Sequence, residues 1–161
     1  MREPVFTETK QICVVVRDIE ATMTTYVHEY GIGPWEIYEF NPDTVQNLTR
    51  DGQLANFAFR LAVTMIGGVQ WELIEPLDDR SIYAEFLSEK GEGVHHVALG
   101  VRDYGEAVET MEAKGRRIVQ GGMYKGATFA YLSTDEDLGV VTEIFDWPAD
   151  RPRQMPDAVY P

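Results

Sequence analysis

The sequence predicts an α+β protein built from two tandem βαβββ modules, on three observations. A strand-like stretch, Gln11–Asp18, is echoed by His96–Asp103, with Val-Arg-Asp matching letter for letter. A second strand-like stretch, Trp71–Pro76, is similar to Thr142–Pro148, so each half begins and ends with a related strand. Between these strands, each half carries one helical pattern and further strand-like stretches. Such self-similarity indicates a duplicated module.

Composition limits the possible classes of protein. The chain has 161 residues, 44% hydrophobic and 25% charged, which suits a single domain over residues 1–161 with a real core. The formal net charge is −13 and no Lys/Arg cluster interrupts it, so we expect neither nucleic acid nor an anionic membrane as a partner. The longest apolar run, Ile12–Val16, is far shorter than the ~20 residues of a membrane-spanning helix.

Cysteine usage and the N-terminus indicate the compartment. Cys13 is the single cysteine, which excludes an internal disulfide. The N-terminus lacks the charged and then apolar pattern of a signal peptide. We therefore expect a cytoplasmic protein.

The first module spans about residues 8–78. Asp18 is placed to cap a helix whose apolar residues recur at helical spacing, and Gly31 is placed to end it. The pair Gly67-Gly68 reads as a hairpin turn. Three strands are predicted after the helix, at Trp35–Phe40, Asn56–Met65 and Val69–Pro76.

A linker of about residues 80–92, with a short helix over Arg80–Lys90, leads to the second module at about residues 93–147. Asp103 and Glu106 are spaced as a capping box, and Gly115 ends that helix. Three strands are again predicted, at Arg117–Gln120, Thr128–Ser133 and Leu138–Asp146. The proline-rich tail, residues 148–161, is expected to lie along the surface or on a partner.

Each repeated strand carries one side chain that can bind a metal ion. Because side chains alternate across a strand, Gln11 shares its face with Cys13, and His96 shares its face with Ala98, so small residues leave space beside these two. The carboxylates would stand on largely apolar faces, where an unpaired charge is costly and a divalent cation supplies the missing partner. The four candidate ligands are Gln11, Glu72, His96 and Glu143.

Simpler interpretations exist for the other reactive side chains. A lone histidine in a strand is usually hydrogen-bonded within the core, and only the repeat favours His96 as a ligand. His95 points to the opposite face and is expected to be structural or to support a ligand, and His28 to be solvated. Cys13 is more typical of a small packing residue than of a reactive thiol. The acidic segment Asp135–Asp137 lacks an EF-hand pattern and is expected to be a solvated hairpin turn.

Two βαβββ modules with metal-bearing strands resemble the vicinal oxygen chelate superfamily, which includes glyoxalase I, methylmalonyl-CoA epimerase, extradiol dioxygenases and bleomycin-resistance proteins. The resemblance covers about residues 8–147. It implies a cupped, mostly antiparallel sheet around one divalent metal ion, with ligands from the first and last strand of each module. Those four positions are held here by Gln11, Glu72, His96 and Glu143. The ligand types match eukaryotic glyoxalase I, whereas Val69–Pro76 and Gly93–Leu99 look more like the epimerases.

The donor set suits Zn, Co, Ni, Mn or Fe. By resemblance, the chain is expected to be a metal-dependent epimerase, racemase or related isomerase or lyase. Its substrate would be a carbon acid next to a carbonyl, reacting through an enolate or enediolate. Glu143 is the candidate proton-shuttling base and Glu72 its counterpart. One departure matters: where epimerases carry a catalytic Glu upstream of the third strand, this chain has Leu54–Phe57, with Gln53 the nearest polar residue.

Two other functions are considered. An extradiol-type dioxygenase needs two histidines and one carboxylate around iron, and Gln11 stands where the first histidine would be. A metal-free small-molecule binding protein of the bleomycin-resistance kind would not need four ligand-type residues in register. Metal analysis separates these classes.

Partners follow from the remaining patterns. A small-molecule substrate is expected, either bulky and apolar or a CoA thioester. A bulky apolar substrate is favoured if one face of the predicted strand Asn56–Met65 is concave. That face carries Phe57, Phe59, Leu61, Val63 and Met65. A CoA thioester needs positive charge for its phosphates, so arginines that are scattered along the sequence would have to cluster in space. These are Arg50, Arg60, Arg80, Arg116 and Arg117. A homodimer is expected because the tail is apolar enough, through Met155, Val159 and Tyr160, to dock on a neighbour.

Overall fold

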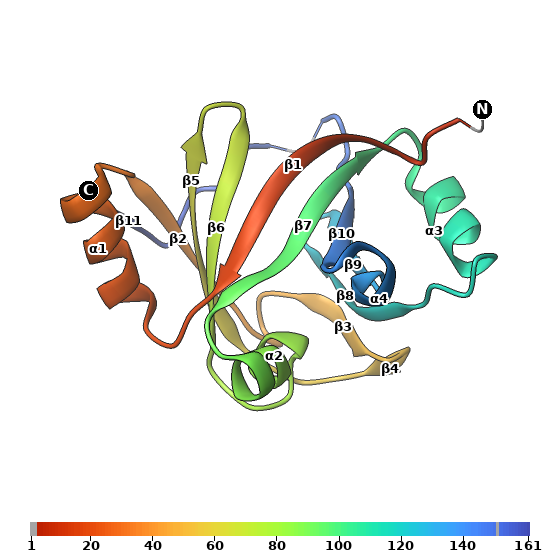
Figure 1. Ribbon diagram of the computed structural model, residues 1–161, viewed down its shortest axis with the longest axis horizontal. Coiled ribbons are helices and arrows are strands. Elements are labelled where there is room, and N and C mark those ends of the chain that lie inside the picture. The colour runs from red at the N-terminus through yellow and green to blue at the C-terminus, as the bar shows by residue number, and fades with distance from the viewer. Residues whose placement is uncertain (1–2, 151) are drawn as a thin grey trace.

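The computed structural model describes residues 3–150 and 152–161, which form one continuous sheet with α1 and α3 on its outer side and α2 at one end of its central strands (Figure 1). Within these residues the sheet has eleven strands, in the order β11-β2-β5-β6-β1-β7-β10-β9-β8-β3-β4. It is mostly antiparallel and curls so that its two ends turn toward each other behind the central strands. The predicted α+β fold class is confirmed.

The two modules have the same internal order. The first contains β1 (Phe6–Val15), α1 (Ile19–Tyr30), β2 (Trp35–Phe40), β5 (Phe59–Ile66) and β6 (Val69–Pro76). The second contains β7 (Gly93–Val101), α3 (Tyr104–Glu112), β8 (Ile118–Tyr124), β9 (Ala127–Leu132) and β10 (Val141–Asp146). In each module the first and last strands pair in parallel, β1 with β6 and β7 with β10. The modules join where β1 and β7 pair antiparallel, at the centre of the sheet.

The predicted N-caps of α1 and α3 are present, whereas α3 ends at Glu112, with Ala113 as its C-cap, before the predicted Gly115. The Asp18 carboxylate accepts a hydrogen bond from the Ala21 amide at 2.9 Å, and Asp103 does the same for Glu106 at 2.8 Å. Gly31 ends α1 with a φ of 66°, a left-handed conformation that glycine adopts without steric cost. The linker helix α2 (Ile82–Lys90) is capped by Ser81. These side chains fix where the chain leaves each strand, and thereby the faces against which the helices pack.

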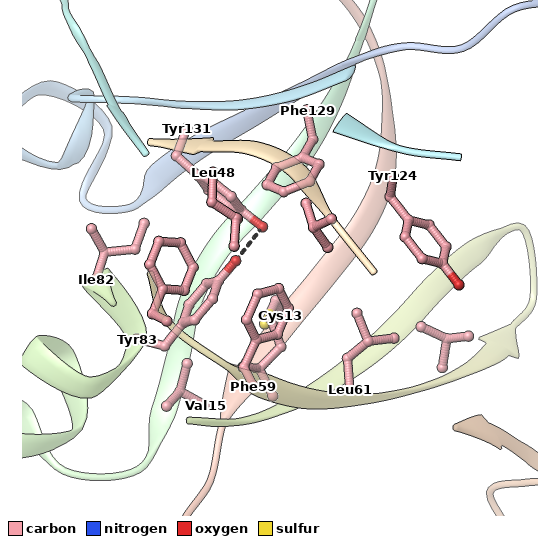
Figure 2. Packing of buried hydrophobic residues seen from close by; sticks show 14 residues of the cluster. Cys13, Val15, Leu48, Phe59, Leu61, Ile82, Tyr83, Tyr124, Phe129 and Tyr131 are labelled. Atoms are coloured by element: carbon pink, nitrogen blue, oxygen red, sulfur yellow. Dashed lines mark hydrogen bonds between the residues drawn. The ribbon is translucent and has the colours of Figure 1, made fainter. Parts of the chain in front are cut away.

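Side-chain alternation divides the packing into an outer and an inner part. On the outer side, Ile19 and Met23 of α1 pack against Leu73 of the first module, and Met111 of α3 packs against Ile144 of the second. The inward-facing side chains form a separate cluster that includes Cys13 and Tyr83 (Figure 2). The inner surface of the sheet is therefore largely apolar, which is the setting of the predicted ligands.

The hairpin of β3 (Gln46–Arg50) and β4 (Gln53–Leu54) was not predicted from the sequence. This hairpin belongs to the first module but pairs with β8 of the second, so it extends the far edge of the sheet. Its strands are short and mostly polar, with Leu48 as the buried residue of β3, so no alternating pattern marks them. The strand predicted to begin at Asn56 begins at Phe59 and ends at Ile66.

Two further expectations were wrong in detail. The acidic segment predicted as a hairpin turn is a single helical turn, α4 (Asp135–Leu138), which ends at Gly139. Its side chains are exposed, and the following strand consequently begins at Val141. Three acidic residues fill the first turn of α4, where negative charge interacts favourably with the helix dipole.

The tail docks on its own chain. Residues Ala158–Tyr160 form β11, which pairs antiparallel with β2. The Tyr160 hydroxyl lies 2.9 Å from Thr24 Oγ1 on α1. Met155 and Val159 remain exposed, at 75% and 59%, so the homodimer stays a prediction. No helix among the described residues combines the length and hydropathy needed to cross a membrane.

Candidate metal centre

The four predicted ligands stand on the four central strands of the sheet. Strand pairing sets Gln70, Gln11, Ala98 and Glu143 side by side in one row across β6, β1, β7 and β10. The next row, two residues along, contains Glu72, Cys13, His96 and Val141. Residues two apart on a strand share a face. The two rows therefore place the four candidates on one face, in two neighbouring rows.

His96 lies between the two carboxylates of this arrangement. Its Nε2 atom lies 3.3 Å from Glu72 Oε2 and 3.2 Å from Glu143 Oε2. All three residues are buried, with His96 at 0% exposure. The structure thus brings together three of the four candidates, from two different modules, around one nitrogen atom.

Gln11 lines the same cavity as Glu72 and Glu143. Its side-chain amide nitrogen donates a hydrogen bond to Gln70 Oε1 at 3.0 Å. That bond fixes the orientation of the amide and leaves the oxygen, which is the atom able to bind a cation, without a donor. Gln70 is therefore a supporting residue that the sequence analysis did not identify.

Three of these groups present buried atoms that lack a hydrogen-bond partner among the described residues. They are Gln11 Oε1, Glu72 Oε2 and His96 Nε2. The carboxylate oxygens lie at ion-pair distances from His96 Nε2, and they can accept a hydrogen bond from it only when that nitrogen carries a proton. An unsatisfied buried polar atom costs roughly 1–3 kcal/mol. One nitrogen and two oxygens in this position form a donor set that a divalent ion would satisfy.

Electrostatics also point to a missing positive charge. Burial alone would lower the pKa of His96, but Glu143 and Glu72 outweigh it and raise that pKa to about 9. Burial raises the pKa of Glu143, although His96 and Tyr131 oppose this. Without a metal ion, a proton therefore sits on His96 between two carboxylates. A divalent ion in this position would supply the positive charge that the two carboxylates otherwise obtain from that proton.

The His/Cys/Asp/Glu group that lies closest together among the described residues includes an unexpected member. Ligand atoms of Cys13, Glu72 and His96 all lie within 4.8 Å of one another. Glu143 is not part of this group, although it touches His96. The cluster is therefore asymmetric, with Glu72 on the cysteine side and Glu143 beyond the histidine.

His95 supports His96, as its position predicted. The Nδ1 atoms of the two rings lie 2.9 Å apart, and the His95 ring packs edge-on against Tyr83 and Phe86. Burial, with the neighbouring charges of His96 and Lys90, lowers the pKa of His95 to about 2, so its ring is neutral and can accept a hydrogen bond. A His96 ring that keeps its proton on Nδ1 for this bond presents a lone pair on Nε2.

Two tyrosines orient Glu143 from the other side. Tyr131 stands opposite Glu143 in the β9–β10 pairing, and its hydroxyl lowers the carboxylate's pKa. Tyr83 donates its hydroxyl hydrogen to the Tyr131 oxygen at 2.7 Å (Figure 2), which frees the Tyr131 hydrogen for Glu143. Neither tyrosine was expected at the site, because the register that brings them together is not visible in one sequence.

A cavity of about 290 Å³ opens above Gln11, Glu72 and Glu143. Phe59, Leu61 and Val63 line it, which confirms that this face of β5 is the concave one. Met65, on the same face, lies beyond the cavity and is 58% exposed. The other walls are mostly aromatic, and the lining includes Tyr38, Phe40, Tyr124, Phe129, Tyr131, Phe145 and Trp147.

The five arginines that a CoA thioester would need do not form a free basic patch. Arg50, Arg116 and Arg117 line a second hollow beside α2, away from the first. Each of the five pairs with a carboxylate: Arg50 with Glu85, Arg60 with Glu20, Arg80 with Asp78, Arg116 with Asp137, and Arg117 with Asp51. Among these five arginines, none is therefore left without a carboxylate partner.

Comparison with known proteins agrees with this geometry. A sequence profile of the Glyoxalase/Bleomycin resistance protein/Dioxygenase superfamily matches residues 10–131. The chain belongs to this superfamily, whose members commonly bind a metal ion. It is also 31% identical over 106 residues to the uncharacterised protein YqjC of Bacillus subtilis, a match that covers 64% of this chain and 73% of the relative.

Solved structures share the fold. A hypothetical protein from Bacillus halodurans C-125 is 23% identical, with a TM-score of 0.68 over 91% of this chain and 98% of that one. A variant of methylmalonyl-CoA epimerase from Streptomyces coelicolor, in a complex with 2-nitronate-propionyl-CoA, is 23% identical, with a TM-score of 0.64 over 92% and 99% of the two chains. The epimerase of Mycobacterium tuberculosis is 20% identical, with a TM-score of 0.62 over 92% and 93%. At these identities the likeness shows the fold alone.

Proposed function

We propose that the chain is a divalent-metal-dependent epimerase, racemase or related isomerase or lyase that removes a proton from a carbon next to a carbonyl group. The observation that supports this most strongly is the set of unpartnered donor atoms on Gln11, Glu72 and His96, with the carboxylate of Glu143 beside them. The superfamily assignment agrees with an enzyme of this kind. We infer a cytoplasmic location because the single cysteine is buried and free.

In this proposal Gln11, Glu72 and His96 hold the ion. A divalent ion bound there would act as a Lewis acid that stabilises negative charge developing on a substrate oxygen. Gln70 and His95 orient two of the three donors through the hydrogen bonds described above. Zn, Co, Ni, Mn and Fe all fit a set of one nitrogen and two oxygens.

Glu143 is the proposed base. It faces an apolar cavity, and burial keeps its pKa above the usual carboxylate range, which brings its proton affinity closer to that required near neutral pH. Tyr131 holds the carboxylate in place. Glu143 takes the α-proton and returns it to the same or a neighbouring carbon. Glu72 lies on the other side of His96 Nε2 and is the counterpart that can act on the opposite face of the substrate.

The substrate is proposed to be a small carbon acid with an apolar or aromatic body. The walls of the cavity are largely aromatic, and the arginines that could bind CoA phosphates are paired. No carboxylate lies at residues 54–57, and Leu54 is 79% exposed on the edge hairpin. Methylmalonyl-CoA itself is therefore not the proposed substrate.

Hydrogen exchange tests the proposed function even where the product of the reaction is unidentified. The cobalt- or zinc-loaded protein would be incubated in deuterated water with aromatic and aliphatic 2-oxo acids, 2-hydroxy acids and thioesters, including methylmalonyl-CoA. Proton NMR should show metal-dependent loss of an α-hydrogen signal from at least one aromatic or branched compound. A metal-loaded protein that exchanges none of them contradicts the proposal, and oxygen consumption by the iron form would indicate a dioxygenase.

Metal binding is expected to weaken as pH falls. In the metal-free protein, His96 is protonated below its pKa of about 9, and this proton must leave before Nε2 can bind an ion. Apparent affinity should therefore fall by up to ~10-fold per pH unit below about 9 and level off above it. Calorimetry of zinc binding in buffers of different ionisation enthalpy should detect the released proton. Affinity that is flat between pH 6 and pH 9 would contradict this role of His96.

A further inference from the structure

We propose that the Cys13 thiolate is a further ligand of the same ion, so that the metal is held by sulfur as well as by nitrogen and oxygen. The inference rests on the metal centre of the proposed function and adds one donor to it. From the sequence, Cys13 was expected to be a packing residue. The structure places it in the centre of the cluster instead.

The strand register puts Cys13 between two of the ligands. It pairs with Glu72 on β6 and with His96 on β7, so these residues are neighbours in one row of the sheet. The side chain of Cys13 points to the inner face, where Figure 2 shows its sulfur among the rings of the cluster. It is 0% exposed, and burial together with Glu72 raises the pKa of its thiol, so an ion that binds the sulfur must displace the thiol proton.

The distances are within the reach of one ion. Ligand atoms of Cys13, Glu72 and His96 lie within 4.8 Å of one another. Because metal–ligand bonds are ~2.0–2.3 Å long, small side-chain rotations would bring all three onto one ion. An independent observation points to the same place, since Glu72 Oε2 and His96 Nε2 are buried and without hydrogen-bond partners among the described residues.

With Cys13 as a ligand, Glu143 no longer has to be both a metal ligand and the proton-shuttling base, the two roles that the resemblance gave it. Glu143 does not belong to the compact group, although it lies 3.2 Å from His96. With Cys13 as a donor, Gln11, Cys13, Glu72 and His96 complete a set of four without using Glu143. The Glu143 carboxylate then remains free to move a proton.

A sulfur donor changes the metal preference of the site. Thiolates favour softer ions such as zinc, whereas carboxylate and amide oxygens suit manganese and magnesium. Zinc binding should therefore depend on Cys13 more strongly than manganese binding does. In Cys13→Ser, zinc affinity is expected to fall by at least ~10-fold with little change for manganese.

Cobalt spectroscopy tests the ligand directly. Cobalt(II) would be added to the metal-free wild-type protein, and a thiolate-to-cobalt charge-transfer band in the near ultraviolet should appear together with the weaker visible d–d bands. The chain has one cysteine, so such a band has one possible source. Cys13→Ser and Cys13→Ala should lose the charge-transfer band and keep the d–d bands, with circular dichroism confirming the fold.

The outcomes separate this inference from the proposed function. Wild-type protein that shows d–d bands at one cobalt per chain but no charge-transfer band overturns the thiolate ligand and leaves the metal-dependent enzyme standing. Wild-type protein that binds no cobalt overturns both. Because the decisive measurement uses the wild type, a variant that fails to fold does not affect it.

Discussion

Glu143→Gln is expected to lower turnover and α-hydrogen exchange by ~10²–10⁴-fold, the range of general-base catalysis. The amide has nearly the volume of the carboxylate but cannot accept a proton at neutral pH. Because Glu143 lies outside the compact group of Cys13, Glu72 and His96, metal occupancy should change much less than the rate. Exchange of the best compound from the panel, measured by proton NMR, gives the rate.

Two controls accompany this measurement. Glu109→Gln removes an exposed carboxylate on α3, away from the cavity, and should behave as the wild type does. Metal content is measured beside each rate, so that a loss of the ion is not mistaken for a loss of the base. A fully metallated Glu143→Gln protein with wild-type exchange would remove Glu143 from the mechanism and leave Glu72 as the candidate.

Metal binding is expected to give the largest change in stability. An ion that binds only the folded protein, present at a hundred times its dissociation constant, should raise the free energy of unfolding by about 2.7 kcal/mol. For a chain of this size that corresponds to roughly 5–11 °C in melting temperature. Differential scanning fluorimetry with zinc or cobalt should show this rise, and a chelator should reverse it.

Substitution of His96 tests where the ion binds. In His96→Ala the metal-induced rise should vanish, because the nitrogen donor between Glu72 and Glu143 is gone. His28→Ala is the matched control, since His28 is exposed on α1 and should leave the rise intact. The comparison uses the metal-induced shift, so any loss of basal stability in His96→Ala does not affect it. A His96→Ala protein that responds to metal as fully as the wild type would contradict the site.

Most of the fold could be predicted because duplication repeats one pattern twice. Strand alternation has a period of two, so the face on which His96 or Glu72 lies followed from the neighbouring residues of its own strand. The edge hairpin of β3 and β4 could not be predicted, because its strands are polar and short. Residues in such strands carry no pattern that distinguishes them from a loop.

The candidate site was predictable where it follows from position in a strand and not where it depends on pairing between strands. Glu72, His96 and Glu143 were expected on one face, and the structure places both carboxylates within 3.3 Å of the histidine nitrogen. Cys13 and Tyr131 join them through the registers of β1 with β7 and of β9 with β10. One sequence does not show those registers, since a shift of a single residue would turn each side chain to the other face.

Anomalous diffraction from crystals of the zinc- or cobalt-loaded protein tests the proposed metal centre most directly. We predict one strong peak per chain at the metal's absorption edge, within bonding distance of His96 Nε2, a Glu72 oxygen and Gln11 Oε1. Cys13 Sγ should also contact that peak if the further inference holds. A metal-saturated crystal with its peak at another surface, or with none between Glu72 and His96, would contradict the metal centre.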